Sequence, residues 1–542
     1  MSGNAAEFMG IPEGRYHWVP GEMVVIVRLP QFPVDYQQDM LVEQVRIQLN
    51  TLLAQYGIAL EPYGTYGRWL NAPVRPPQPS FIFALHRKQP LIAIFFHTRH
   101  VDPNVSDPTP MALSYLQGHL EQLAQAGLQL VSSMPNWLVT AAPFFYADGG
   151  PALPPRPAPM LDVAAPPNAL LGWHMQVLER GIPLDTKGAE DVVVAVLDTA
   201  HPVDRIRTAA TRPELRRNWL LQRLARDLRN DDGPFGVEYD RYMVSNDICT
   251  GRDDENDARY YLMPDHGLSV AGLIRDIAPR ARIRLIRILN DFGGSDLYAL
   301  FAALTDLERE LFSGSIRRLV INLSLTIMPD IIRIPYIWFA GRQWPSTQVM
   351  GVTRVLNQIE EGLRLLFEGL YAQGALVVAA AGNDSLSAVQ QGLSRRAPRA
   401  PARYETTLSV TSLNAGFAAS SFANAANIPP SSAGVATYGG DGHGALDKQG
   451  LPDAVRGIYI SSHFPNGEQN LSGWADWCGS SLATPIISAL GAHLMAQGLS
   501  ASNIITRLSA GSERRDTQLF GAAPDVPEVL ANMIRVQQHF GL

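Results

Sequence analysis

The sequence predicts an α/β protein with a mainly parallel sheet, preceded by a smaller domain of strands and helices. Short, continuous apolar runs such as DVVVAVLD (191–198) recur through the second part of the chain. Longer helical patterns separate these runs, and a proline-rich segment separates them from the N-terminal part. Because the strands of a parallel sheet are buried on both faces, they are apolar throughout, and helices connect them.

The second part of the chain carries four such strand candidates, which alternate with helix candidates. They are residues 191–198, 281–289, 317–325 and 375–383. This alternation predicts a parallel sheet that is covered by helices on both faces. In such folds the functional residues lie at the carboxyl ends of the strands, which is where Asp198, Ser324 and Asn383 fall.

The N-terminal part predicts a separate β-α-β-β-α-β domain. Its strand candidates are rich in β-branched and aromatic residues, and its helix candidates have apolar residues at helical spacing. In chain order these elements are a strand at 23–29, a helix at 35–57, a hairpin of 80–86 and 91–98, a helix at 110–127 and a strand at 128–133. This order is the ferredoxin-like arrangement.

A segment dense in proline, residues 147–167, predicts an extended linker, because its composition supports neither helix nor sheet. It divides the chain into an N-terminal domain of residues 1–146 and a larger domain of residues 168–542. We expect two insertions in the larger domain, at about 203–262 and 327–350.

The composition of the 542 residues is that of an ordinary globular protein, with 46% hydrophobic and 18% charged residues. A net charge of −7 gives no electrostatic reason to expect nucleic acid or an anionic membrane as partner. The two cysteines, Cys249 and Cys478, cannot form a disulfide framework. We find neither a secretory signal pattern nor an apolar run of membrane-spanning length, so a cytoplasmic location is expected.

Four polar residues are candidates for chemistry, and each also has an ordinary structural explanation. Asp198 ends a buried strand and could cap a loop, and Asn383 could belong to a turn. His266 opens a helix rich in small residues, where a lone histidine is more often structural. Ser481 precedes the apolar run IISALGAHLMA, where it could be a helix N-cap or a nucleophile beside the helix dipole.

The short sequence motifs around these residues resemble those of the subtilisin family of serine proteases. They are VVVAVLDT, HGLSVAGLI, VINLSL, GALVVAAAGN and GSSLATP, in that order, and the likeness covers about two thirds of the chain. The resemblance implies a catalytic triad of Asp198, His266 and Ser481, with Asn383 as a donor in the oxyanion hole. The serine would attack a peptide bond to form an acyl-enzyme, with the histidine as general base.

The resemblance also implies which residues bind the substrate. They are Ser324, Leu325 and Thr326 on one side, Ala381 and Gly382 on the other, and Arg399 in the pocket for the P1 side chain. Thr326 stands where the family usually has glycine, so we expect a narrower pocket. Arg399 belongs to the basic stretch 395–403, for which two interpretations stay open. It is either a solvated loop or the part of the pocket that binds an acidic P1 residue.

The N-terminal domain is similar to the propeptides of that family. This implies that residues 1 to about 150 inhibit the protease and assist its folding, with MPNWLVTAAP (134–143) as the tail that enters the substrate groove. The protein would then be a zymogen whose own N-terminal domain is an intramolecular inhibitor. Its other partners would be protein or peptide substrates.

Other interpretations remain beside this one. A catalytically silent binding protein on the same scaffold would be indicated by the loss of a triad residue, and all three are present. An esterase of the α/β-hydrolase type would carry a G-x-S-x-G motif, which this sequence lacks. The acidic stretch Asp253–Asp257 could hold Ca²⁺ or simply be solvated. No cofactor is required for the expected reaction, and no metal ligands are assigned.

Overall fold

The computed structural model describes most of the chain, which clusters into two compact units. The described residues are 18–31, 38–64, 78–105, 107–141, 153–158, 189–228, 233–245, 248, 261–327, 349–427, 434–446 and 452–509. The first unit contains residues 1–139, 296–313 and 327–373, and the second contains residues 140–295, 314–326 and 374–542. Among the helices within these described ranges, none has the length and apolar character needed to cross a membrane.

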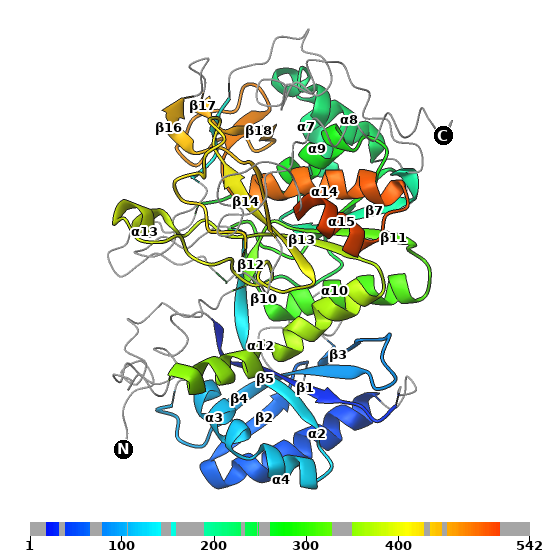
Figure 1. The fold of residues 1–542 in the computed structure, drawn as a ribbon, viewed down its shortest axis with the longest axis vertical. Coiled ribbons are helices and arrows are strands. Elements are labelled where there is room, and N and C mark those ends of the chain that lie inside the picture. The colour runs from blue at the N-terminus through cyan, green and yellow to red at the C-terminus, as the bar shows by residue number, and fades with distance from the viewer. Residues whose placement is uncertain are drawn as a thin grey trace. The chain divides into compact units, whose positions relative to one another are not determined.

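The first unit is built on an antiparallel sheet with the predicted ferredoxin-like strand order (Figure 1). Its strands are β1 (Trp18–Arg28), β2 (Ile58–Pro62), β3 (Ser80–Phe83), β4 (Leu91–His100) and β5 (Leu130–Thr140). β1 lies between β5 and β4. β2 pairs with residues 96–100 of β4 and β3 pairs with residues 91–94, so the two form one edge of the sheet in two pieces.

Three helices pack on this sheet: α2 (Gln38–Leu53), α3 (Thr109–Gly118) and α4 (Leu120–Gln125). Val45 and Leu49 of α2 share one buried core with Ile92 and Phe96 of β4. The single helix predicted over 110–127 is interrupted at His119, whose φ of −125° lies outside the helical range.

The strands differ most from the prediction at two places. The sequence gives little signal for β2, because IALEP is short and ends in a proline. β5 continues to Thr140, beyond the strand predicted over 128–133, because Met134, Trp137 and Val139 are buried. Much of the stretch that we expected to be a tail is therefore part of the sheet.

Two helices from later in the chain also belong to the first unit, α10 (Leu297–Phe312) and α12 (Val349–Ala372). The carboxylate of Glu308 on α10 accepts hydrogen bonds from the backbone N–H groups of Ala84 and Leu85, at 3.1 and 2.9 Å. Gln373 donates to the same carboxylate at 2.8 Å. The first unit thus combines segments from both sides of the proline-rich stretch 147–167.

The second unit is built on a seven-stranded parallel sheet, which confirms the predicted α/β fold (Figure 1). In spatial order its strands are β15 (Gly434–Tyr438), β14 (Thr407–Leu413), β13 (Leu376–Ala380), β11 (Arg318–Leu323), β7 (Val192–Asp198), β9 (Arg282–Arg287) and β8 (Phe235–Glu238). All neighbours pair in parallel. β7 and β13 are buried along their whole length, which explains their uninterrupted apolar sequences.

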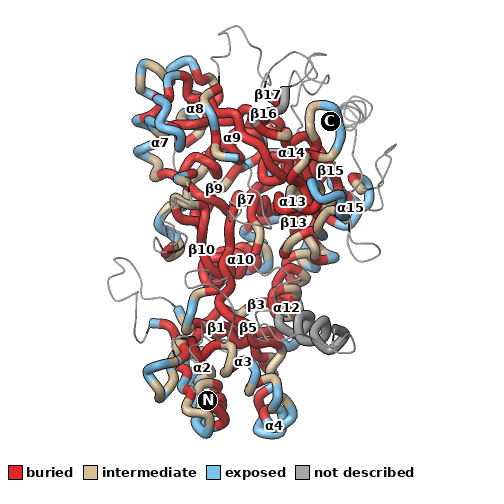
Figure 2. Tube along the Cα trace, turned by 90° about the vertical axis from the view of Figure 1, so that its left-hand side faces the viewer, coloured by how far each residue is buried: buried red, intermediate tan, exposed pale blue. Residues whose placement is uncertain are grey.

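The second unit also holds helices, of which two carry predicted site residues. They are α7 (Val203–Thr211), α8 (Trp219–Asp227), α9 (His266–Ile277), α13 (Leu386–Gln390), α14 (Ser480–Ala496) and α15 (Ala501–Ser509). α14 lies against β7, β11, β13 and β14. All residues of α9 are buried (Figure 2). Helices α7 and α8 and strand β8 fall inside the predicted insertion 203–262.

Short elements complete the described chain. They are the 3₁₀ turns η2 (Ala54–Tyr56), η3 (Ala189–Asp191) and η4 (Pro213–Leu215) and the strands β6 (Arg156–Pro157), β10 (Gly294–Asp296), β12 (Thr326–Ile327), β16 (Gly442–Leu446), β17 (Pro452–Asp453), β18 (Val455–Ile458) and β19 (Trp474–Trp477). β18 pairs with β19, and β6 pairs with β19. The expectation that 147–167 supports no sheet is therefore wrong at β6, where an edge position tolerates the proline.

Candidate active site

Asp198 is the last residue of β7, and its side chain is fully buried. β7 pairs with β9 and β11, so the carboxylate stands at the carboxyl end of a central strand, as the sequence predicts. The backbone N–H of Thr199 donates to its Oδ1 at 2.7 Å. This bond fixes the carboxylate relative to the turn that follows the strand.

His266 is the first residue of α9, and its Nδ1 contacts both carboxylate oxygens of Asp198, at 2.8 and 3.0 Å. Gly267 allows this approach, because a Cβ at this position would lie 2.0 Å from the carbonyl oxygen of Thr199. The Gly267 N–H also donates to the Thr199 hydroxyl at 3.0 Å. The start of α9 is thereby held against the end of β7.

The Asp198 contact determines what the imidazole can do. Because Nδ1 donates its proton to the carboxylate, a neutral His266 carries its lone pair on Nε2. That Nε2 is buried and has no hydrogen-bond partner among the described residues. A buried nitrogen without a partner is costly, and such atoms in a folded protein call for an explanation. Here the unpartnered atom is the one that a general base would use.

Ser481 lies in the first turn of α14, which follows Gly479 with its positive φ of 141°. Pro485 lies within the same helix and has no N–H, so it cannot donate to the carbonyl of Ser481 four residues earlier. The hydroxyl of Ser324 donates to that carbonyl instead, at 2.7 Å. The Ser324 hydroxyl in turn accepts from Asn322 at 3.0 Å. Sequence reasoning assigned Ser324 to the substrate, and its side chain supports the serine turn.

The Oγ of Ser481 is the second buried atom at this place without a hydrogen-bond partner in the described part of the chain. The segment that precedes Ser481 contacts the histidine. The ring of His266 packs edge-on against the ring of Trp477, with 5.6 Å between the ring centres. Trp477 ends β19, four residues before Ser481. The unpartnered atoms are thus the hydroxyl of the predicted nucleophile and the ring nitrogen of the predicted base.

Asn383 follows β13, and its side-chain oxygen accepts from the backbone N–H of Ser480 at 2.9 Å. Since a backbone N–H can only face an oxygen here, this bond fixes the orientation of the carboxamide. The Nδ2 group is then left as a donor, and within the described residues it makes no hydrogen bond. The backbone of α14 adds the partial positive charge of a helix N-terminus. The arrangement can stabilise an oxyanion.

The residues predicted to flank the substrate lie in the same unit. Leu325 is 1% exposed and Ala381 is fully buried, whereas Thr326, at the start of β12, is partly exposed. Gly382 has a φ of +108°, and a Cβ there would lie 2.6 Å from the side-chain nitrogen of Asn424. Only glycine fits this position without strain.

Arg399 is engaged by an acid that the sequence analysis missed. Its Nε donates to Asp384 at 2.8 Å, and its Nη2 bonds the same carboxylate oxygen. Arg396 lies 3.9 Å from this carboxylate, and the amide of Asn424 also donates to Asp384. An acidic P1 side chain would have to share Arg399 with Asp384, which disfavours that interpretation of the basic stretch. The sequence offers one sign of this acid: Asp384 directly follows the predicted site residue Asn383.

Several expectations cannot be placed. The acidic stretch Asp253–Asp257, Cys249 and most of the insertion 327–350 lie outside the described residues. Within the described residues, no group of three or more potential metal ligands is found. Cys478 is a buried free thiol whose burial raises its pKa to about 12.

The contact between Asp198 and His266, with a serine at a helix start and an oriented carboxamide, is the kind of arrangement that serine hydrolases use. The subtilase family matches residues 189–508, a range that contains all four residues and more than half of the chain. The chain therefore belongs to the subtilase family, whose members are serine peptidases.

No curated protein matches the chain. Among solved structures, the crystal structure of a lanthipeptide protease matches with 17% sequence identity and a TM-score of 0.43. The match covers 72% of this chain and all of that one. At this score the likeness supports no inference about substrate.

Proposed function

We propose that the protein is a serine endopeptidase that cleaves protein or peptide substrates through an acyl-enzyme. The observation that carries the proposal is the pair of buried, unpartnered atoms, His266 Nε2 and Ser481 Oγ, beside a carboxylate-bound Nδ1. No packing role requires either atom to lack a partner. A reaction in which a proton moves from hydroxyl to imidazole requires both to be available.

The chemistry follows from the geometry of these groups. Nε2 of His266 takes the proton as Ser481 Oγ attacks the carbonyl carbon, and Asp198 stabilises the resulting imidazolium. The negative charge on the carbonyl oxygen is met by Nδ2 of Asn383 and by backbone N–H groups at the start of α14. The imidazolium then gives its proton to the leaving amine. Water repeats the attack on the acyl-enzyme and frees the serine.

The N-terminal segment, residues 1 to about 150, would inhibit this site until cleavage removes it. Two observations support this part of the proposal. The segment forms a ferredoxin-like sheet. Its backbone N–H groups also bind Glu308 on α10, a helix that lies in the range matched by the family. Intact-mass analysis of wild type and Ser481→Ala tests it. We expect a shortened chain in the wild type alone, and an uncleaved, fully active wild type would contradict it.

Hydrolysis of casein by the purified chain tests the main proposal, with Ser481→Ala as the catalytic variant and Ser502→Ala, an exposed serine on α15, as the matched control. We expect hydrolysis by the wild type and the control only. If the wild type binds unfolded protein without cleaving it, the silent binding protein is the correct interpretation. Equal hydrolysis by Ser481→Ala would assign the activity to another residue.

A further inference from the structure

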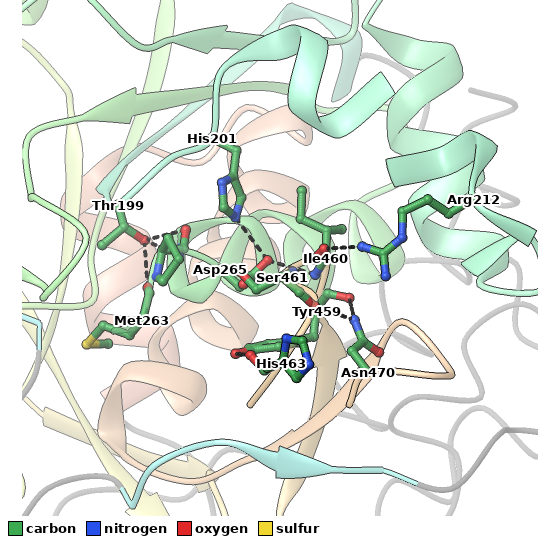
Figure 3. Close-up of polar contacts among 12 residues, drawn as sticks. Thr199, His201, Arg212, Met263, Asp265, Tyr459, Ile460, Ser461, His463 and Asn470 are labelled. Carbon is green, nitrogen blue, oxygen red and sulfur yellow. Dashed lines mark hydrogen bonds and ion pairs between the residues drawn. The ribbon is translucent and has the colours of Figure 1, made fainter. Parts of the chain in front are cut away.

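A second buried histidine–aspartate pair lies next to the first along the chain. Nε2 of His201 contacts Oδ1 of Asp265 at 3.0 Å, and the two side chains are 1% and 0% exposed (Figure 3). His201 follows Asp198 by three residues, and Asp265 directly precedes His266. Neither residue has a part in the proton transfer described above.

The carboxylate of Asp265 also binds a third segment. The backbone N–H of Ile460 donates to its Oδ1 at 2.7 Å, and that of Ser461 donates to its Oδ2 at 3.3 Å. These residues come directly after β18. β18 pairs with β19 from Val455–Trp477 to Ile458–Trp474, and β19 leads into the turn that holds Ser481. One carboxylate thus joins the segments that carry Asp198 and His266 to a strand that pairs with the one leading to Ser481.

The segment that Asp265 binds is itself fixed from its other side. Asn470 donates to the carbonyl oxygens of Tyr459 and Ser461, at 2.8 and 2.9 Å. Arg212 donates to the carbonyl oxygen of Ile460 at 2.9 Å (Figure 3). Asp265 therefore connects the start of α9 to a strand end whose backbone is hydrogen-bonded from both sides.

We propose that His201 and Asp265 are positioning residues that hold His266 and Ser481 at reacting distance. The proposal rests on the proposed function and adds a group outside the triad to it. His201 attaches the junction to the turn after Asp198, and Asp265 attaches it to α9 and to the segment after β18. Without His201, the Asp265 carboxylate loses one of its partners and the start of α9 can shift.

The charge of Asp265 agrees with this role. Burial alone raises the pKa of its carboxyl group, but the neighbouring His201 and the hydrogen bonds from 460 and 461 outweigh burial and lower the pKa. A charged carboxylate makes stronger hydrogen bonds to backbone N–H groups than a neutral acid does.

The test measures inactivation of the full-length chain by an alkyl fluorophosphonate, which separates binding (KI) from the chemical step (kinact). His201→Leu removes the donor to Asp265, whereas His201→Gln keeps an N–H close to the position of Nε2. Arg275→Gln is the matched control, because Arg275 is buried near the opposite end of α9 and donates to Pro279 and Ala281 at 2.8 and 3.1 Å.

We expect His201→Leu to lower kinact by about 10- to 100-fold with KI changed by less than about threefold, since small misplacements of reacting groups act on the chemical step. His201→Gln should recover most of that loss. Arg275→Gln should lower Tm while kinact stays within about twofold of wild type. Measurements are made well below the lowest Tm. If His201→Leu does not fold, His201→Asn replaces it, because the shorter amide does not reach Asp265.

Three results would overturn the inference. One is a wild-type kinact in His201→Leu or its replacement, and another is a loss in Arg275→Gln as large as that in the His201 variant. The third is a failure of His201→Gln to exceed the other His201 variant. In each of these cases the wild type still reacts, so the proposed function stands. A wild type that does not react even after its chain has been shortened contradicts the proposed function itself.

Discussion

Two buried histidine–aspartate pairs lie at the carboxyl end of β7 and the start of α9, and they use opposite ring nitrogens. His266 contacts Asp198 through Nδ1, whereas His201 contacts Asp265 through Nε2. Both carboxylates also accept a backbone N–H. The two histidines differ in their second ring nitrogen. Nε2 of His266 is buried and has no hydrogen-bond partner among the described residues, whereas neither ring nitrogen of His201 is a buried atom of this kind.

In the proposed function, this difference separates a pair that takes part in the reaction from one that holds segments in place. Packing favours the satisfaction of every buried polar atom, so an unpartnered imidazole nitrogen persists where another interaction, made only with substrate or in a transition state, requires it. The carboxylate of the His201–Asp265 pair accepts hydrogen bonds at both oxygens, which suits a role in holding segments together.

The largest expected effect comes from exchanging the two aspartates for asparagine. Asp198→Asn should lower kcat by about 10⁴-fold, because an amide at this position no longer selects the Nε2 lone pair. Asp265→Asn should lower kcat by roughly 10-fold, since it disturbs only position. Peptide hydrolysis with thermal melting as a folding check measures both. Similar losses in the two variants would remove the distinction between the pairs.

Asn383 gives the next largest effect. Asn383→Ala should lower kcat by about 100- to 1,000-fold, the range known for this residue type in subtilisin itself. Asn383→Asp keeps an oxygen for the Ser480 N–H but replaces the Nδ2 donor with a carboxylate oxygen that repels the oxyanion, so its loss should be at least as large. A near wild-type kcat for Asn383→Asp would show that the carboxamide serves only to hold the serine turn.

Glu308 in the first unit extends the comparison to a buried carboxylate with no imidazole beside it in the described contacts. Burial raises its pKa from 4.5 to about 7, against the N–H groups of Leu85 and Ala84, which lower it. Its stabilising contribution is therefore fully present below about pH 4.5 and is lost as the pH rises through about 7.

The corresponding change in unfolding free energy of the first unit is about 3 kcal/mol over that window. Urea unfolding between pH 4 and 8 measures it. We expect Glu308→Gln to remove the slope and also to lower stability, because its amide would face an N–H donor. A wild-type profile without a slope in this window would contradict the assignment. Asp265, whose pKa is lowered, should lose stability only at acidic pH.

The smallest effect concerns the carbonyl of Ser481. Ser324→Ala should destabilise the chain by about 1–2 kcal/mol and lower kcat a few-fold, because Pro485 offers no N–H to replace the lost hydroxyl. Pro485→Ala supplies an N–H, so the double variant should recover part of the loss. Additive losses in this double-mutant cycle would show that the two residues do not act on the same carbonyl.

The parts of the fold and site that depend on local patterns were predictable from the sequence. Uninterrupted apolar runs predicted the central strands. Distinctive short motifs around Asp198 and His266 singled out these two residues, whose side chains are in contact. The edge strand β2 was missed because five residues ending in proline carry little periodicity. The length of β5 was missed because a strand buried along most of its length shows no alternation.

The parts that depend on distant contacts were not predictable. The pairing of Arg399 with Asp384, and of His201 with Asp265, follows from how loops converge after folding and not from any spacing in the chain. The same holds for the hydroxyl of Ser324, whose partner lies 157 residues away. Each of these polar side chains had several ordinary explanations until its neighbours were known.

The most direct test of the central claim is peptide mapping of the fluorophosphonate adduct of the full-length protein, in the wild type and in His266→Ala. We predict a single modified residue, Ser481, and a labelling rate that falls by at least about 10³-fold without the imidazole. A label on any other residue, or an unchanged rate in His266→Ala, would contradict the assignment of the unpartnered nitrogen and hydroxyl to catalysis.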